Sequence, residues 1–179
     1  MPDFQLCQFM SKSSLSKELK TLSKEQLVQI ILDAYSANGD FKEYFEFFLN
    51  PDVQKLMQKY EKKIAKELNR TKWNYSKARV SEIKRAVKDF SGYNPGPEHV
   101  MQFMIRTLML MGATERYIEF KPLHFRFIMT LTRQIVEYGD NNQMASECLS
   151  ELLKICNNIN FTTYFRNLVS RAMNGEEFD

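Results

Sequence analysis

The fold is decided by the stretch Asn50-Pro-Asp-Val-Gln-Lys-Leu-Met-Gln-Lys-Tyr-Glu-Lys-Lys-Ile-Ala-Lys-Glu-Leu-Asn-Arg70. Asn50 is a favourable N-cap, and Pro51 at the first helical position has a backbone angle that suits a helix start. Apolar residues then recur at helical spacing and share one face about 120° wide. These residues are Val53, Leu56, Met57, Tyr60, Ile64 and Leu68. The stretch therefore predicts an amphipathic helix that runs to about Arg70 and packs one face against a core.

Apolar residues recur at helical spacing along most of the remaining chain as well. Gly (6) and Pro (5) are scarce among the 179 residues, and an all-β fold needs more of both at its chain reversals. Short turns separate the predicted helices, so antiparallel neighbours are expected. The sequence predicts an all-α fold of about eight helices in antiparallel hairpins, forming a compact bundle or a short solenoid-like stack.

Polar residues mark the expected ends of these helices. Residues 23–26 have the pattern of a capping box. Gly39 is expected to take the left-handed position after one helix, and Asp40 is expected to cap the next. Gly139 is expected to close a later helix, and residues 71–76 are interpreted as a polar connector.

The chain is predicted to form a single helical domain over residues 1–179. Residues 1–12 are interpreted as a loose lead-in. Residues 91–97, Ser-Gly-Tyr-Asn-Pro-Gly-Pro, are rich in helix breakers and are the only candidate sub-boundary. The sequence leaves open whether this segment is a hinge.

Charge is distributed unevenly along the chain. The net charge is +3, yet the segment from Lys55 to Lys88 holds 12 Lys and Arg against 3 Glu, a local net charge of +9. The remainder of the chain is mildly acidic. A basic region on an acidic body indicates a surface for an acidic partner.

Four lysines of this region, at positions 55, 59, 62 and 66, follow one helix face over roughly 16 Å. Nucleic-acid phosphates present a comparable ladder of charge. Trp73 and Tyr75, if exposed between cations, can stack on bases. The alternatives are a solvated lysine face with Trp73 against the core, or docking onto an acidic protein, including the acidic part of another copy. The candidate binding residues are Lys55, Lys59, Lys62, Lys66, Arg70, Lys72, Trp73, Tyr75, Lys77 and Arg79.

Motifs of catalysis and of metal or cofactor binding are missing from the sequence: there is no HExxH, GxGxxG, P-loop, GxSxG or EF-hand loop. The two histidines are His99 and His124, and His124 shares an apolar helix face, which favours a core histidine. The alternative pairs His124 with Cys148 or Cys156 as base and nucleophile. Both cysteines lie on an apolar face, where burial raises a thiol pKa and makes it inert. No catalytic residue, metal ligand or cofactor is therefore predicted.

Localisation is inferred from the cysteines and from the apolar stretches. Cys7 brings the cysteines to three, an odd number without CxxC spacing, which favours reduced thiols. No export signal is recognised, and the longest apolar stretch, residues 100–113, is too short to span a membrane. A cytoplasmic protein is expected. The stretch is rich in methionine, which predicts core filling or, alternatively, an adaptable groove for a partner helix.

Several segments together resemble an uncharacterised bacterial family, found mainly in Bacteroidetes and known only as a domain of unknown function. They are Leu15-Ser-Lys-Glu-Leu-Lys-Thr-Leu-Ser-Lys-Glu-Gln-Leu27, Lys42-Glu-Tyr-Phe-Glu-Phe-Phe-Leu-Asn-Pro51, Lys62-Lys-Ile-Ala-Lys-Glu-Leu68 and Ser76-Lys-Ala-Arg-Val-Ser-Glu-Ile-Lys-Arg-Ala-Val-Lys-Asp-Phe90. The resemblance covers the first half of the chain by sequence and the second half by helix order. It implies an all-helical fold and supplies no catalytic residues.

The sequence thus predicts a non-enzymatic helical interaction module whose basic face binds a protein partner or another copy of the chain. The alternative is a nucleic-acid-binding accessory protein that uses the same face. An unrecognised enzyme is the third hypothesis, and it requires a polar cleft with a perturbed titratable group.

Overall fold

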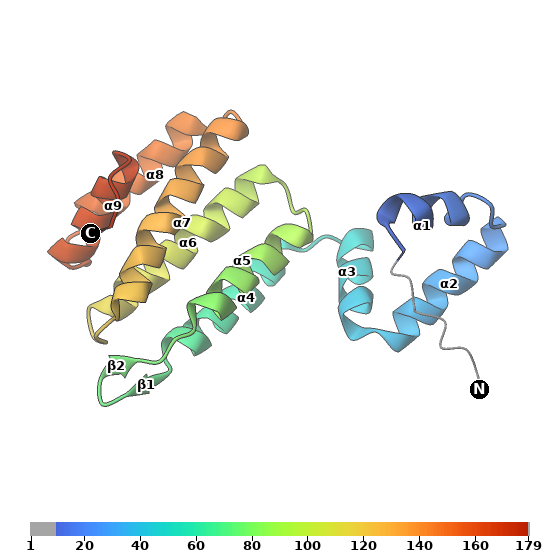
Figure 1. The fold of residues 1–179 in the computed structure, drawn as a ribbon, viewed down its shortest axis with the longest axis horizontal. Helices are drawn as coiled ribbons and strands as arrows, with labels where there is room; N and C mark the ends of the chain where they lie inside the picture. Colours follow the sequence, from blue (N-terminus) through green and yellow to red (C-terminus); the bar gives the residue numbers. More distant parts are fainter. Residues whose placement is uncertain (1–9, 179) are drawn as a thin grey trace, which may run out of the picture. The chain divides into compact units, whose positions relative to one another are not determined.

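The computed structural model describes residues 10–178 (Figure 1). Within this range the secondary structure consists of nine helices and one two-stranded β-hairpin, which confirms the all-α prediction. The lead-in expected over residues 1–12 falls mainly on residues 1–9, which lie outside the described residues. The chain divides into two compact units, Met1–Asn50 and Pro51–Asp179.

The described part of the first unit, residues 10–50, holds three helices, of which α2 and α3 pack against each other. The Tyr35 hydroxyl of α2 donates a hydrogen bond of 2.9 Å to Glu46 of α3. The Tyr35 ring also meets the Phe45 ring edge-on, with 6.4 Å between the ring centroids. The helices are α1 (Lys12–Leu19), α2 (Lys24–Ala37) and α3 (Gly39–Leu49).

The helix ends of this unit follow the predictions only in part. The capping box is confirmed, since the Ser23 amide donates to the Gln26 side chain at 2.9 Å and the Gln26 amide donates to Ser23 Oγ at 3.2 Å. The expected roles of Gly39 and Asp40 are wrong. Gly39 is the first residue of α3, and the side chain of Asn38 accepts from the amides of Asp40 and Phe41. An Asn side chain is an effective N-cap, so one residue ends α2 and begins α3.

Apolar side chains of the first unit are not enclosed. No residue between 10 and 50 is buried, although the spacing of Ile30, Ile31 and Phe48 predicts inward faces. The Phe48 side chain, for example, is 66% exposed.

The second unit is a stack of three helical hairpins, α4/α5, α6/α7 and α8/α9 (Figure 1). Helices α4, α6 and α8 form one layer, and α5, α7 and α9 form the other. The sequence predicts either a compact bundle or a short solenoid-like stack, and the arrangement of this unit is the solenoid-like one. The helices are α4 (Val53–Leu68), α5 (Val80–Gly92), α6 (Pro97–Glu115), α7 (Pro122–Asn141), α8 (Ala145–Asn157) and α9 (Thr163–Met173).

Helix α6 lies in the middle of this stack and contacts α4, α5, α7 and α8. It is apolar nearly all round, and Gln102 and Arg106 form its exposed strip as predicted. Phe103 of α6 stacks on Phe90 of α5 with 4.3 Å between the ring centroids. The predicted inward face of α4 is confirmed, with only Val53 half-buried.

Two helix ends in the second unit differ from the predictions. Asp52, not Asn50, caps α4, because its carboxylate accepts from the Lys55 amide at 3.0 Å. Gly139 does not close α7, which continues to Asn141. Gly139 is buried instead because α8 passes close to it, and an added Cβ would lie 2.7 Å from Cys148 Cβ.

Residues 91–97 lie inside the second unit and join α5 to α6. Gly96 in this segment has a positive φ of 105°, a conformation that favours glycine. None of the helices between residues 10 and 178 combines the length and apolarity needed to cross a membrane.

Candidate basic interface

The predicted connector at residues 71–76 is a β-hairpin. Strands β1 (Thr71–Lys72) and β2 (Tyr75–Ser76) pair antiparallel, with Lys72 opposite Tyr75. Trp73 and Asn74 form the two-residue turn with positive φ values of 55° and 64°. Such a turn matches the twist of paired strands, but it favours Asn and Gly over Trp. The sequence signal is therefore weak, which explains why the hairpin is missed.

The hairpin is fastened to the rest of the unit by backbone hydrogen bonds. The Ser76 amide donates to the Glu119 carbonyl at 2.8 Å, and the Glu119 amide donates to the Asn74 carbonyl at 2.9 Å. The Lys77 amide donates to the Arg70 carbonyl at 2.7 Å. These hydrogen bonds fix the backbone on both sides of the turn. The backbone that carries the Trp73 side chain at the tip is therefore ordered.

His124 at the start of α7 fixes the chain below the hairpin. It is 2% exposed, and its Nδ1 accepts from the Lys121 amide at 3.0 Å. Its Nε2 therefore carries the proton and donates to the Ala78 carbonyl at 2.9 Å. The prediction of a satisfied core histidine is confirmed. It forms no pair with Cys148, whose thiol donates to the Ile135 carbonyl at 3.3 Å.

Both aromatic residues of the candidate site are exposed. The Trp73 side chain at the hairpin tip is 83% exposed, and that of Tyr75 is 48% exposed. The neighbouring Lys72 and Lys77 are also exposed. Trp73 therefore does not lie against the core, whereas the solvated lysine face stays a prediction.

At the base of the hairpin, Glu67 binds two cationic residues of the predicted site. Its Oε1 accepts from Arg79 Nε at 3.1 Å and from Arg70 Nη1 at 2.6 Å. It also accepts from the Arg79 amide at 2.8 Å. The guanidinium and amide of Arg79, with help from Arg70, lower the pKa of Glu67 to about 2. Arg70 and Arg79 are thus anchored and partly neutralised, a pairing that the sequence analysis did not identify.

A cavity of about 570 Å³ lies between α4 and α5 beside this anchor. It brings together Lys66, Arg70 and Arg79 of the predicted site, with Lys63 and Arg85 added. Glu82 and Asp89 also line it, so its positive charge is partly compensated. The predicted residues Lys55, Lys59 and Lys62 do not line the cavity, although they belong to the same helix.

A second cavity, of about 500 Å³, lies where α5 and α7 begin. Among the described residues its lining includes four cations, Lys77, Arg79, Lys84 and Lys121, and no carboxylate. Lys84 and Lys121 are not among the predicted site residues, because only the packing of α7 beside α5 brings them to Lys77. The cavity adjoins the hairpin through Ser76, which also lines it.

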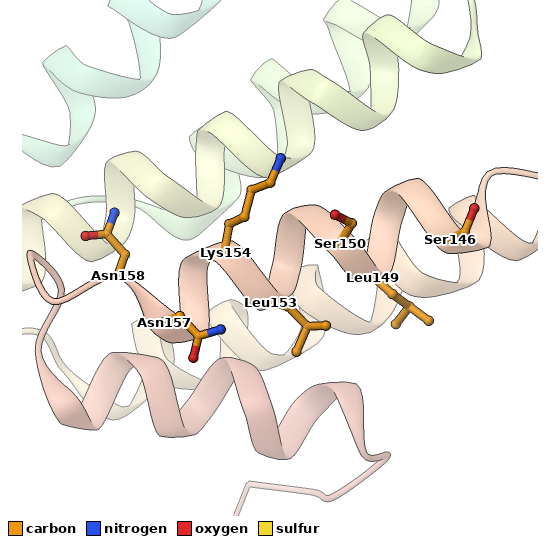
Figure 2. Close-up of a pocket in the computed structure, with 7 residues that line it drawn as sticks. All are labelled: Ser146, Leu149, Ser150, Leu153, Lys154, Asn157 and Asn158. Atoms are coloured by element: carbon orange, nitrogen blue, oxygen red, sulfur yellow. The ribbon is translucent and has the colours of Figure 1, made fainter.

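The other candidate groups among the described residues are the α8 cavity, the metal-ligating side chains and the cysteines, and they do not lie together in one site. A cavity of about 710 Å³ is lined by residues of α8 and the residue that follows it. Figure 2 shows these side chains, among which Lys154 is the titratable group. No group of three or more metal-ligating side chains occurs among residues 10–178. Burial raises the pKa of the thiols of Cys148 and Cys156, as predicted, and Asp140 adds to the effect at Cys148. Cys7 lies outside the described residues.

Comparison with known proteins bears on the family and not on the site. No curated protein and no solved structure matches the chain. A family model described as a family of unknown function (DUF6155) matches residues 10–176, which is most of the chain. The predicted resemblance to a domain of unknown function is therefore confirmed: the chain belongs to the family of unknown function DUF6155.

Proposed function

We propose that this protein is a non-enzymatic helical interaction module that binds an acidic protein partner through its basic surface. The basic surface comprises the lysine face of α4, the hairpin 71–76 and the two cavities at residues 63–89 and 76–124. The observation that carries the proposal is Trp73, which is 83% exposed at the tip of the hairpin whose Ser76 lines a cavity with the cations Lys77, Arg79, Lys84 and Lys121.

Trp and Arg are enriched among the residues that dominate binding energy at protein interfaces. An exposed Trp is costly in water, and this one projects from a turn that backbone hydrogen bonds hold in place. Because the backbone that carries this side chain is already ordered, less conformational entropy is lost on binding. The surrounding cations attract an acidic partner and speed its encounter with the Trp.

Nucleic acid is the second candidate partner, and the exposure of Tyr75 together with Trp73 favours it. Two aromatic side chains among cations can stack on successive bases of a single strand. The cations would then contact phosphates, and binding would weaken steeply with salt. The basic surface thus suits an acidic protein and a nucleic acid alike. The relative affinities of the protein for the two kinds of partner distinguish between these candidates.

The proposal places the chain in the cytoplasm, where reducing conditions keep cysteines as thiols. Within residues 10–178 both Cys148 and Cys156 are free thiols, which supports this placement. The non-enzymatic part of the proposal is supported by His124, whose two ring nitrogens are occupied by backbone groups. His124 lines the second cavity, but neither ring nitrogen is free to exchange a proton with a substrate there.

Fluorescence anisotropy tests the proposal with labelled single-stranded DNA, single-stranded RNA, duplex DNA and a Glu-rich peptide, each at ~50 and ~200 mM salt. We expect the Glu-rich peptide to bind, and its affinity to fall at least about tenfold at the higher salt. Tighter binding of a single strand, with quenching of Trp73 fluorescence, would favour the nucleic-acid candidate instead.

The variant Lys72→Glu/Lys77→Glu is expected to abolish this binding. The matched control Lys17→Glu/Lys24→Glu makes the same charge change on exposed lysines of the first unit and is expected to preserve it. Absence of binding to all four probes at the lower salt would overturn the proposal. Equal loss in both variants would show that net charge, not the basic surface, is responsible.

A further inference from the structure

A groove runs along the outer side of α6, in the layer that α6 shares with α4 and α8. Its volume is about 940 Å³. Glu98 and Ala113 mark its ends on α6, a span of about 22 Å at the rise of an α-helix. Glu61 of α4 lines one side, and Glu147 of α8 lines the other. The groove is therefore long enough to hold a helix of about four turns.

The floor of the groove is apolar and rich in methionine. Met101 and Met109 of α6 and Met144 before α8 line it. Met109 is 40% exposed, whereas Met101, Met104 and Met111 of the same helix are buried. The prediction of core filling therefore applies to these three buried methionines, and the prediction of an adaptable surface applies to Met109. Unbranched, polarisable methionine side chains adjust to the shape of a partner helix.

The rim of the groove is acidic. Glu98, Glu147 and Glu151 line it, and its only lining cation is Arg106. Arg106 already donates to Glu61 at 2.9 Å. Neither Glu98 nor Glu147 forms an ion pair with any residue between 10 and 178. Glu151 is paired with Lys154, so the unpaired charges of the rim are those of Glu98 and Glu147. An apolar floor beside these two carboxylates is complementary to an apolar stripe flanked by cations.

We infer that this acidic methionine groove binds an amphipathic helix of a partner protein, one whose apolar stripe is flanked by Lys or Arg. Helices in grooves are a recurring mode of recognition, with apolar anchors at i, i+3, i+4 and i+7. The inference does not rest on the function proposed above, since no residue of the groove belongs to the basic surface.

The described helices of this chain do not match that occupant. Helix α4 is basic and amphipathic, but its apolar face is already buried in its own core. Helices α2 and α3 expose apolar side chains but carry more acidic than basic residues. Helix α1 is basic and exposes Leu15, but its eight residues span about 12 Å against about 22 Å for the groove. No helix among residues 10–178 therefore matches the occupant, and we assign it to a different protein.

Fluorescence anisotropy with three labelled peptides of about 16 residues tests the inference on the full-length protein. The first peptide has leucines at i, i+3, i+4 and i+7 with flanking lysines. The second has the same composition in scrambled order, and the third has Glu in place of Lys. We expect the first peptide to bind at least about ten times more tightly than either control. Only this peptide combines an apolar stripe at helical spacing with flanking positive charges.

Two variants locate the binding on the groove. Met109→Glu places a charge on the floor, and Glu98→Lys/Glu147→Lys reverses the rim at exposed positions. Each is expected to weaken the first peptide at least about tenfold. Circular dichroism spectra and melting temperatures check that both remain folded, and the rim variant decides the matter if Met109→Glu unfolds.

Three control variants guard against other binding surfaces. Leu153→Glu alters the exposed α8 face of Figure 2, and Leu32→Glu alters an exposed apolar side chain of the first unit. Lys72→Glu/Lys77→Glu alters the basic surface. All three are expected to retain the affinity of wild type. Unchanged binding in both groove variants, loss in Leu32→Glu, or equal binding of the scrambled peptide would overturn the inference.

Discussion

Glu67 is a structural anchor at the scale of single residues. It belongs to α4 but accepts hydrogen bonds from Arg79, twelve positions later, and from Arg70. Its side chain is only 12% exposed, so water screens these interactions weakly. Removing the charge would leave two guanidinium groups with a neutral acceptor in place of their shared carboxylate. The residue therefore stabilises the junction of α4, the hairpin and α5.

We expect Glu67→Gln to lower the free energy of unfolding at pH 7 by about 1–3 kcal/mol. Because the folded pKa is lowered to about 2, the ionic contribution is fully present above the unfolded pKa of about 4.3. It is lost as pH falls from about 4.3 towards 2, so the difference between wild type and variant should shrink over that range. Urea denaturation at a series of pH values measures it.

Glu82→Gln is the matched control, because Glu82 is more exposed and lies 3.9 Å from Arg79. It should cost less than about 0.5 kcal/mol, as expected of an exposed ion pair. An equal loss in both variants, or a Glu67→Gln effect that does not change with pH, would contradict the anchoring role.

Single residues were predictable from sequence where one helix decides their environment. His124 shares a face with apolar residues of its own helix, and it is buried as predicted. Arg70 and Arg79 were predicted to face a partner, yet both are held by Glu67. That pairing depends on the hairpin turning the chain back towards α4. Periodicity along one helix carries no information about such a turn.

At the scale of elements, α6 and α9 meet where α6 has a glycine. A Cβ at Gly112 would overlap the ring of Phe165, which is fully buried. Alanine has the higher helix propensity, but here its methyl group would push the ring from its place. We expect Gly112→Ala to lower stability by about 1–3 kcal/mol, measured by chemical denaturation.

Gly92 of α5 is the matched control, since a Cβ there meets nothing within 4 Å. Gly92→Ala should therefore leave stability unchanged or raise it by up to about 1 kcal/mol. If both substitutions had the same sign, close packing at Gly112 would not be what determines its effect.

Elements were predictable to the extent that their periodicity is strong. The inward face of α4 and the all-round apolar character of α6 follow from residue spacing, and both are observed. The hairpin could not be predicted, because its turn residues, Trp73 and Asn74, do not by themselves favour positive φ angles at both positions. Tertiary hydrogen bonds to Glu119 hold them there.

At the scale of the whole molecule, basic and acidic surfaces occupy different parts of one stack. The cation-lined cavity lies where α5 and α7 begin, and the acidic methionine groove follows α6. The uneven charge was evident from the sequence, and the methionine-rich stretch indicated a groove as the alternative to core filling, but the acidic rim of the groove was not predicted. Its rim combines carboxylates from three helices, so only the stacking of hairpins assembles it.

The two units differ in how far each can stabilise itself. Every buried residue among residues 10–178 belongs to the second unit. We therefore expect a fragment of residues 51–179 to unfold cooperatively, with a melting temperature within a few degrees of the full chain. A fragment of residues 1–50 should show no cooperative transition, because chains near about 40 residues rarely fold alone without disulfides, metals or oligomerisation.

Circular dichroism at 222 nm during heating measures both fragments against the full chain, at equal concentration. Loss of the cooperative transition in the 51–179 fragment would mean that the first unit contributes to its core. A cooperative transition in the 1–50 fragment whose midpoint rises with concentration would show self-association instead. Since the basic surface and the acidic methionine groove both lie within residues 51–179, the same fragment should also retain both binding activities.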